Sequence, residues 1–177
     1  ISIIGCGVVL ASFALSIWVF LQVKNGNSQD VNYFDFISVG SLDINFEFKI
    51  DPLSSLFLLI ITGVGSLIHI YSTSYMNHER SDHFGRYFSY LNLFVFSMLL
   101  LVMGGNYVIM FIGWEGVGLC SYLLIGYWFK NQEYNKAANK AFIMNMFGDL
   151  AFLIALFWLI QEVGSVSFNE VLYPCNL

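Results

Sequence analysis

Charged residues are scarce in this chain. Asp, Glu, Lys and Arg make up 11% of its 177 residues, whereas an ordinary globular domain carries about a quarter. A water-soluble domain of this size could not cover its surface with so few charges, and the mean hydropathy is +0.70. The apolar content of 58% also excludes a disordered chain, which is poor in apolar residues.

Basic residues, cysteine and proline are also few. The net charge of −5 excludes a nucleic-acid-binding protein, which needs a basic face. Cys6, Cys120 and Cys175 lie far apart without a CxxC pair or a His/Cys ligand spacing. We therefore expect neither a disulfide scaffold nor a metal site, and interpret the thiols as small buried hydrophobic groups. The class that remains is a polytopic membrane protein.

Five apolar runs are long enough to span a bilayer, which takes about 20 mostly apolar residues. They cover residues 3–23, 52–75, 87–104, 107–129 and 137–161. Asp51 suits the N-cap of the second run and Pro52 its first helical position, and Gly104-Gly105-Asn106 predicts a tight turn before the fourth. The sequence thus predicts an all-α integral membrane protein with a bundle of about five transmembrane helices.

A short β-hairpin is predicted between the first two helices. Apolar and polar residues alternate from Leu42 to Ile50, the period of a half-buried strand. Gly40-Ser41 could join it to an earlier strand from Tyr33 to Val39. We expect two parts, the first helix with this hairpin (residues 1–50) and the main helical domain (residues 51–177). Because the chain begins at Ile1 and ends just beyond an apolar helix, we expect a fragment of a longer protein.

Lys and Arg residues in short loops predict the orientation. Residues 76–86 and 130–140 belong to one face, which holds Arg80, Arg86, Lys130, Lys136 and Lys140. The opposite face has only Lys24 and Lys49, beside the acids of the hairpin region. We expect the basic face to be cytoplasmic (or in the matrix), with the hairpin and the C-terminal tail on the outer face.

Glu115 is the strongest candidate for a functional residue. It lies inside the fourth apolar run, about 12 Å from its start at 1.5 Å per residue. A carboxylate at such a depth is costly, by about 2.5 kcal/mol or more, and such residues usually face the bundle interior or a water-filled path. Gly113, Gly116 and Gly118 would let a helix or a water chain approach closely. We predict a proton or ion role; the alternative is a carboxyl group that only hydrogen-bonds between helices.

Asp149 is the second candidate, near the middle of the fifth run. Asn145 lies one turn earlier on the same face, so together they form a polar spot on an apolar helix. Either Asp149 carries protons, as intramembrane acids often do, or it is a hydrogen-bonding group that positions its helix.

Two further residues are possible auxiliaries, His69 and Lys140. His69 belongs to a polar stripe on one face of the second helix; the other members are Ser55, Thr62, Ser66 and Thr73. It could relay protons, but a polar seam between helices is the better interpretation. Lys140 lies near the start of the fifth helix, where its long side chain can extend to the interface.

Three segments carry a family resemblance that covers nearly the whole chain. They resemble the third, fifth and sixth helices of one protein family. In that order, the segments are IDPLSSLFLLIITGVGSLIHIYSTSYM (residues 50–76), FIGWEGVGLCSYLLIGYW (residues 111–128), and KAANKAFIMN followed by GDLAFLIAL. This is the family of antiporter-like membrane subunits of respiratory complex I (NADH:quinone oxidoreductase), subunit five or L. The resemblance implies a hairpin on the outer face and a bacterial or mitochondrial inner membrane.

The same resemblance implies roles and partners. Glu115 matches the family's key glutamate, which pairs with a lysine on a later helix outside this chain; Lys140 is not a substitute. Asp149 matches the Asp of an Asn-Arg-x-Gly-Asp pattern, but Met146 stands where the family usually has Arg, so the charge balance around Asp149 differs. FMN, iron–sulfur clusters and quinone would be held by partner subunits, and this chain would hold none.

Three functions therefore remain open. The first is a proton-pumping subunit of NADH:quinone oxidoreductase, driven by redox chemistry on other subunits and in contact with other antiporter-like subunits and lipid. The second is a subunit of a multisubunit cation/proton antiporter. The third is a structural membrane scaffold, which the mid-membrane acids disfavour.

Overall fold

Five long helices, one short helix and one hairpin make up the computed structural model, which describes residues 2–24, 28–39, 42–76 and 81–172. The elements are α1 (Ser2–Val23), β1 (Gln29–Val39), β2 (Leu42–Ile50), α2 (Pro52–Tyr75), α3 (Ser81–Met103), α4 (Tyr107–Ile125), α5 (Gln132–Val163) and α6 (Phe168–Leu172). Helices α1 to α5 are each long and apolar enough to cross a membrane. The predicted all-α bundle with a hairpin is confirmed.

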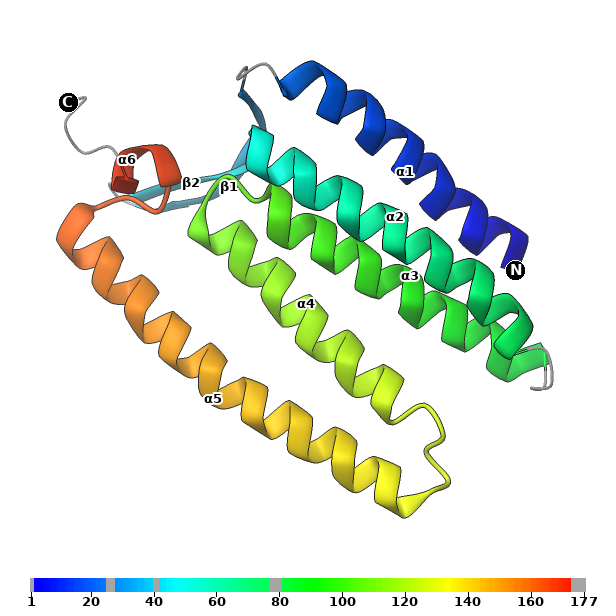
Figure 1. The fold of residues 1–177 in the computed structure, drawn as a ribbon. Coiled ribbons are helices and arrows are strands. Elements are labelled where there is room, and N and C mark those ends of the chain that lie inside the picture. The colour runs from blue at the N-terminus through cyan, green and yellow to red at the C-terminus, as the bar shows by residue number, and fades with distance from the viewer. Residues whose placement is uncertain (1, 25–27, 40–41, 77–80, 173–177) are drawn as a thin grey trace.

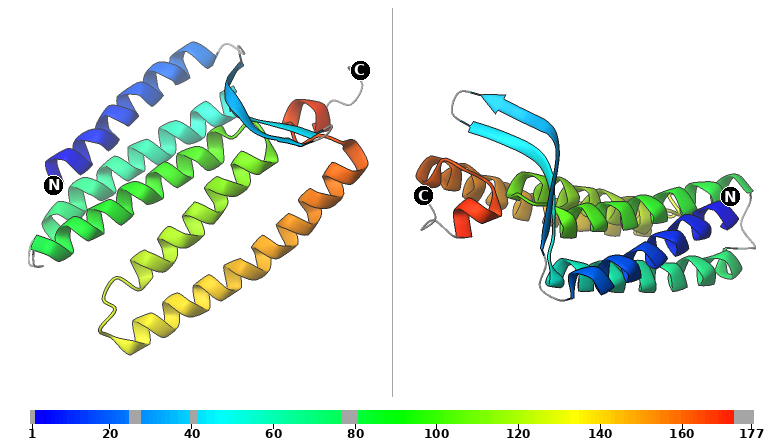
Figure 2. Two further views of the ribbon diagram at one scale, coloured as in Figure 1. Left: turned by 180° about the vertical axis from the view of Figure 1, so that it is seen from behind. Right: turned by 90° about the horizontal axis from the view of Figure 1, so that it is seen from above.

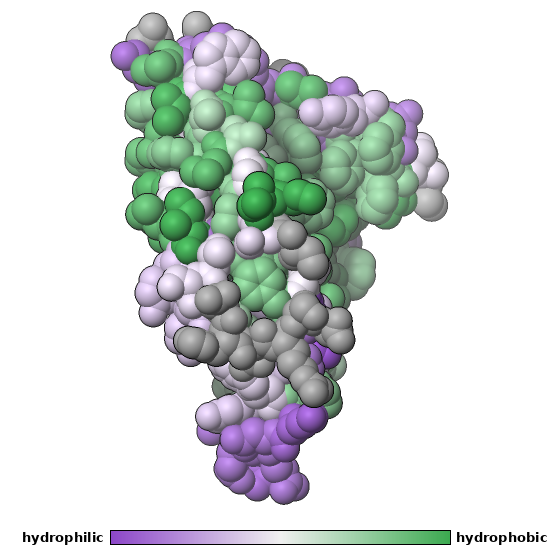
Figure 3. Space-filling view, turned by 90° about the vertical axis from the view of Figure 1, so that its right-hand side faces the viewer, coloured by the Kyte–Doolittle hydropathy of each residue, from purple (hydrophilic) through white to green (hydrophobic). Residues whose placement is uncertain are grey.

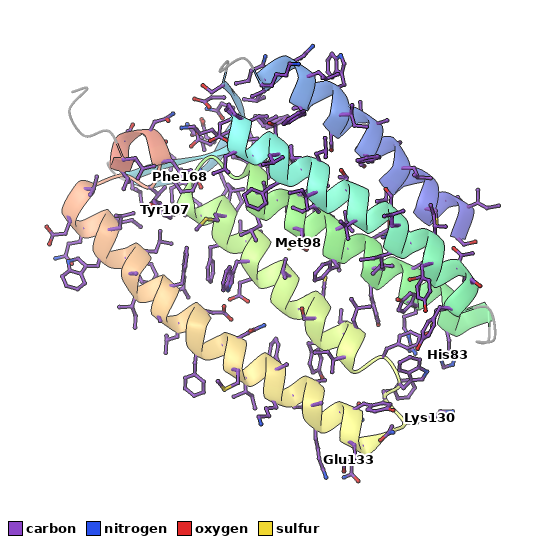
Figure 4. The ribbon with its side chains drawn as sticks, in the orientation of Figure 1. His83, Met98, Tyr107, Lys130, Glu133 and Phe168 are labelled. Atoms are coloured by element: carbon purple, nitrogen blue, oxygen red, sulfur yellow. The ribbon has the colours of Figure 1, made fainter. Side chains whose placement is uncertain are left out.

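The helices α2 to α5 follow one another in a row, and α1 packs against α2 (Figures 1 and 2). Along the helix axes, the hairpin, the α3–α4 turn and α6 lie at one end of the helices. The α4–α5 connection lies at the opposite end (Figure 1). Hydrophilic residues gather at that second end, where α5 begins, while apolar side chains cover much of the surface above (Figure 3). Tyr107 and Phe168 mark the hairpin end in Figure 4, and Lys130 and Glu133 the opposite one.

The predicted helix bounds need correction where helical turns are polar. The third helix begins at Ser81 instead of residue 87, and the fifth runs over Gln132–Val163 instead of 137–161. At the start of α5 the Asn131 side chain caps the helix by accepting from the Glu133 backbone N–H at 3.0 Å, and Lys136 pairs with Glu133 at 3.0 Å. A search for apolar runs cannot detect turns of this kind.

The other differences concern the fourth helix, the first strand and the chain's last helix. Helix α4 ends at Ile125 instead of residue 129, with Gly126 as its C-cap. Strand β1 begins at Gln29 instead of Tyr33 and pairs antiparallel with β2 through two register shifts, so period-two alternation is lost along it. The short helix α6 was not predicted. The predicted turn at Gly40-Ser41, Arg80 and Cys175 lie outside the described residues.

The Gly104-Gly105-Asn106 turn joins the hairpin to the helices. The Gly105 N–H donates to the Glu47 carbonyl at 3.0 Å, and a Cβ atom on Gly105 would lie 2.7 Å from Glu47 Cγ. Asn106 is 1% exposed; it caps α4 through the Ile109 N–H (2.9 Å) and donates to the Asn45 carbonyl (2.7 Å). The predicted turn therefore also fixes where α4 begins relative to β2. At the start of α2 the predicted cap is present as well, since Asp51 accepts from the Ser54 N–H at 2.6 Å.

Candidate functional site

Glu115 lies on α4 with its side chain exposed in this structure. Within the part of the chain that the structure describes, no hydrogen bond or ion pair to its carboxyl group is found. The neighbouring glycines explain how α4 is held. A Cβ atom on Gly113 would lie 2.6 Å from Leu101 Cα, and one on Gly116 would lie 2.9 Å from Ser97 Cβ. Both glycines therefore let α3 approach α4 closely, while Glu115 points away from that contact.

Asp149 is buried, with 7% of its surface exposed. Its Oδ1 accepts a hydrogen bond from Trp114 Nε1 at 2.9 Å. Trp114 belongs to α4 and directly precedes Glu115, so this bond joins the two helices that carry the candidate acids. The carboxyl groups of Glu115 and Asp149 are close enough to interact electrostatically. The structure thus brings together the two acids that the sequence singled out from segments 34 residues apart.

Asn145 also lies at the contact between α4 and α5. Its Nδ2 would be 3.2 Å from a Cβ atom on Gly118. Gly118 therefore allows a close approach of α5, whereas Gly113 and Gly116 allow that of α3. Lys140 is exposed, and among the described residues it makes no ion pair with Glu115 or Asp149. It lies nine residues before Asp149 on α5, about 13 Å at 1.5 Å per residue. Lys140 is therefore not part of this group.

His69 is fully buried and lies apart from the acids. Its Nδ1 is 2.8 Å from the Gly65 carbonyl, and the ring meets Phe88 of α3 edge-on at 6.1 Å. Another member of the stripe contacts α1 instead, since Thr62 Oγ1 donates to Ser16 Oγ at 3.2 Å. Because α3 and α4 stand between α2 and α5 (Figure 1), the structure does not bring His69 to Asp149. The geometry agrees with a polar seam between helices.

Trp114 is the residue that sequence reasoning missed. A signal was available, because a tryptophan N–H inside a membrane needs an acceptor and Trp114 adjoins an intramembrane acid. The acceptor lies on another helix, so it could not be named without the relative position of α4 and α5.

Comparisons with known families match two parts of the chain. Residues 36–88 match the model described as NADH-ubiquinone oxidoreductase (complex I), chain 5 N-terminus. Residues 104–174 match the transmembrane model described as NADH:quinone oxidoreductase/Mrp antiporter. The two matches follow each other in chain order and together cover most of the chain, including α4 and α5.

Individual relatives agree. The chain is 42% identical over 173 residues to NADH-quinone oxidoreductase subunit L of Mycobacterium tuberculosis, and the aligned region makes up 96% of this chain and 27% of the relative. It is 38% identical over 170 residues to NADH-ubiquinone oxidoreductase chain 5 of Hypocrea jecorina, and the aligned region makes up 96% of this chain and 24% of the relative. The chain thus spans about a quarter of the length of these curated relatives.

A solved structure shows the same fold. The Mrp complex from a Dietzia species contains a chain that matches with a TM-score of 0.78 and 25% identity, over 95% of this chain and 18% of that one. With five helices able to span a bilayer and relatives of this kind, the chain is a multi-pass integral membrane protein. It belongs to the family of antiporter-like membrane subunits described as complex I chain 5, or subunit L.

Proposed function

We propose that the chain is part of a proton-translocating membrane subunit of NADH:quinone oxidoreductase, and that Glu115 and Asp149 carry protons through it. The observation that supports this most is the meeting of two intramembrane acids at one helix contact, α4 with α5, in a chain of this family. Two carboxylates repel each other in a medium of low dielectric constant. A proton that arrives on either group relieves that repulsion, so the pair can accept and pass on protons.

The redox chemistry belongs to other subunits in this proposal. NADH is oxidised and quinone is reduced on partners that hold FMN and iron–sulfur clusters, and this chain contributes no electron carrier. Other antiporter-like subunits and the lipid of a bacterial or mitochondrial inner membrane are the expected neighbours.

A subunit of a multisubunit cation/proton antiporter is the second candidate. It is supported by the match to the Mrp complex and by a family model that covers both kinds of protein. Glu115 and Asp149 would keep their roles there, but a cation gradient would replace NADH oxidation as the driving force.

The energy source separates the two candidates. The full-length protein would be tagged, extracted in mild detergent, and analysed by mass spectrometry for copurifying subunits; native membrane vesicles would be energised with NADH or with a sodium gradient. Flavin and iron–sulfur subunits, with proton uptake driven by NADH, support the redox enzyme. Copurification of hydrophobic antiporter subunits alone, with proton movement driven by sodium, contradicts it and supports the antiporter.

A further inference from the structure

Four contacts between α4 and α5 follow one another in antiparallel order, each made by a side chain of α5. Phe111 stacks on Phe152 with ring centroids 5.2 Å apart, and Tyr122 lies against Phe142 at 5.3 Å. Between them lie the Trp114–Asp149 hydrogen bond and the approach of Asn145 to Gly118. We call these four contacts the α4–α5 seam. Contacts on both sides of Trp114 hold the helices in one register, so the indole N–H is aimed at Asp149.

Asp149 has an unusual environment for a buried acid. Within the described residues, Trp114 Nε1 is the sole hydrogen-bond donor to its carboxyl group, and no cation pairs with it. Met146, one turn earlier on α5, is 54% exposed and cannot serve as a donor. A buried carboxylate without a partner is expensive, and a hydrogen bond to a charged group contributes more than one between neutral groups.

The geometry points to a specific role for Trp114, which rests on the proposed proton-translocating function. We propose that Trp114 is a positioning residue whose indole N–H holds the Asp149 carboxyl group in the α4–α5 seam, beside Glu115, in the orientation needed for proton transfer. Trp114 transfers no proton itself. Because it directly precedes Glu115, any displacement of α4 moves both the donor to Asp149 and the neighbouring acid together.

The ionisable groups around Asp149 are few. Glu115, the residue after Trp114 on α4, is close enough to interact with it electrostatically. On α5 itself the nearest ionisable side chain is Lys140, at a distance that excludes an ion pair. A change in the infrared signal of Asp149 after a substitution at position 114 can therefore be assigned to the lost N–H or to Glu115, and a Glu115→Gln background separates these two.

A second tryptophan provides the matched control. Trp158 Nε1 donates to Glu162 Oε1 at 3.2 Å, again an indole bonded to a carboxylate. Both residues belong to α5 and are exposed, so that bond joins no helices and lies outside the α4–α5 seam. Trp158→Phe removes the same chemical group without disturbing Asp149.

The test uses the full chain in its native membrane complex. Trp114→Phe, Trp158→Phe and Asp149→Asn would be compared in proton pumping per substrate turnover and in the carboxyl-stretch infrared signal that Asp149→Asn removes. Loss of a hydrogen bond to a charged group lowers the population of the held orientation about tenfold or more. We expect Trp114→Phe to shift the infrared signal and lower pumping at least several-fold, Trp158→Phe to do neither, and Trp114→Phe to add nothing in an Asp149→Asn background.

A shape-preserving variant guards against misfolding. Benzothienylalanine at position 114 keeps the fused ring but replaces the N–H by sulfur, so it should reproduce the effect of Trp114→Phe in a normally assembled complex. Unchanged pumping and an unchanged Asp149 signal in that variant would overturn the positioning role. The proposed function would still stand after that result if Glu115→Gln abolishes pumping. Normal pumping by Asp149→Asn would mean that Trp114 has no functional acid to position, and the inference would fail.

Discussion

Gly113 controls how closely α3 and α4 approach. A Cβ atom there would lie 2.6 Å from Leu101 Cα and closer still to Leu101 N. Ordinary contacts begin near 3.4 Å, so Gly113→Ala requires the backbones to separate by about 0.8 Å (3.4 minus 2.6) to clear Leu101 Cα, and by more to clear Leu101 N. The obstructing atoms are backbone, which no change of rotamer can move aside. Overpacking of this kind destabilises by about 1–3 kcal/mol.

Gly148 is the matched control for this substitution. It also lies inside a long helix, α5, but a Cβ atom there meets nothing within 4 Å. Gly148→Ala therefore adds only helix propensity, which stabilises by about 0.5–1 kcal/mol. The free energy of unfolding of both variants would be measured in detergent micelles by denaturant titration with circular dichroism. Equal stability of the two variants would refute the close α3–α4 approach.

The remaining predictions concern contacts near the site. Gly116→Ala should destabilise the protein by about 1–3 kcal/mol because its Cβ would lie 2.9 Å from Ser97 Cβ. Adding Ser97→Gly should restore much of the lost stability in the double variant. No rescue in the same denaturant titration would argue against this contact. Asn106→Ala should destabilise by about 2–4 kcal/mol, since it removes a helix cap and leaves the Asn45 carbonyl without its donor. Asn131→Ala, at an exposed cap, should lower the free energy of unfolding by only about 1 kcal/mol. Equal melting temperatures for the Asn106→Ala and Asn131→Ala variants would contradict the dual role of Asn106.

The membrane spans were predictable from the sequence because each is a long apolar run with few charges. Their ends were not, since the first turns of α3 and α5 are polar. In α5 the first turn is helical with the help of the Asn131 cap and the Lys136–Glu133 pair. The second strand was visible in its period of two. The first was seen only in part, because the register shifts at Asn32/Phe34 and Asp35/Ile37 interrupt its alternation.

The candidate site was predicted as two separate acids. An intramembrane carboxyl group stands out in any apolar run, so Glu115 and Asp149 needed no structure to be noticed. Their meeting depends on the register of α4 against α5, which the stacked Phe111 and Phe152 help to set. That register is a property of packing between distant segments, so the link through Trp114 became visible only in the structure.

Glu115 is central to the proposed function, and its titratable proton is the feature to remove. Glu115→Gln keeps the size and hydrogen-bonding capacity of the side chain but cannot ionise. Glu133→Gln is the control, because Glu133 is an exposed acid at the start of α5, outside the predicted membrane span. Proton pumping per NADH oxidised would be measured in native membrane vesicles that contain the full-length protein. We predict that Glu115→Gln abolishes pumping through this subunit while Glu133→Gln retains it; normal pumping by Glu115→Gln would contradict the account.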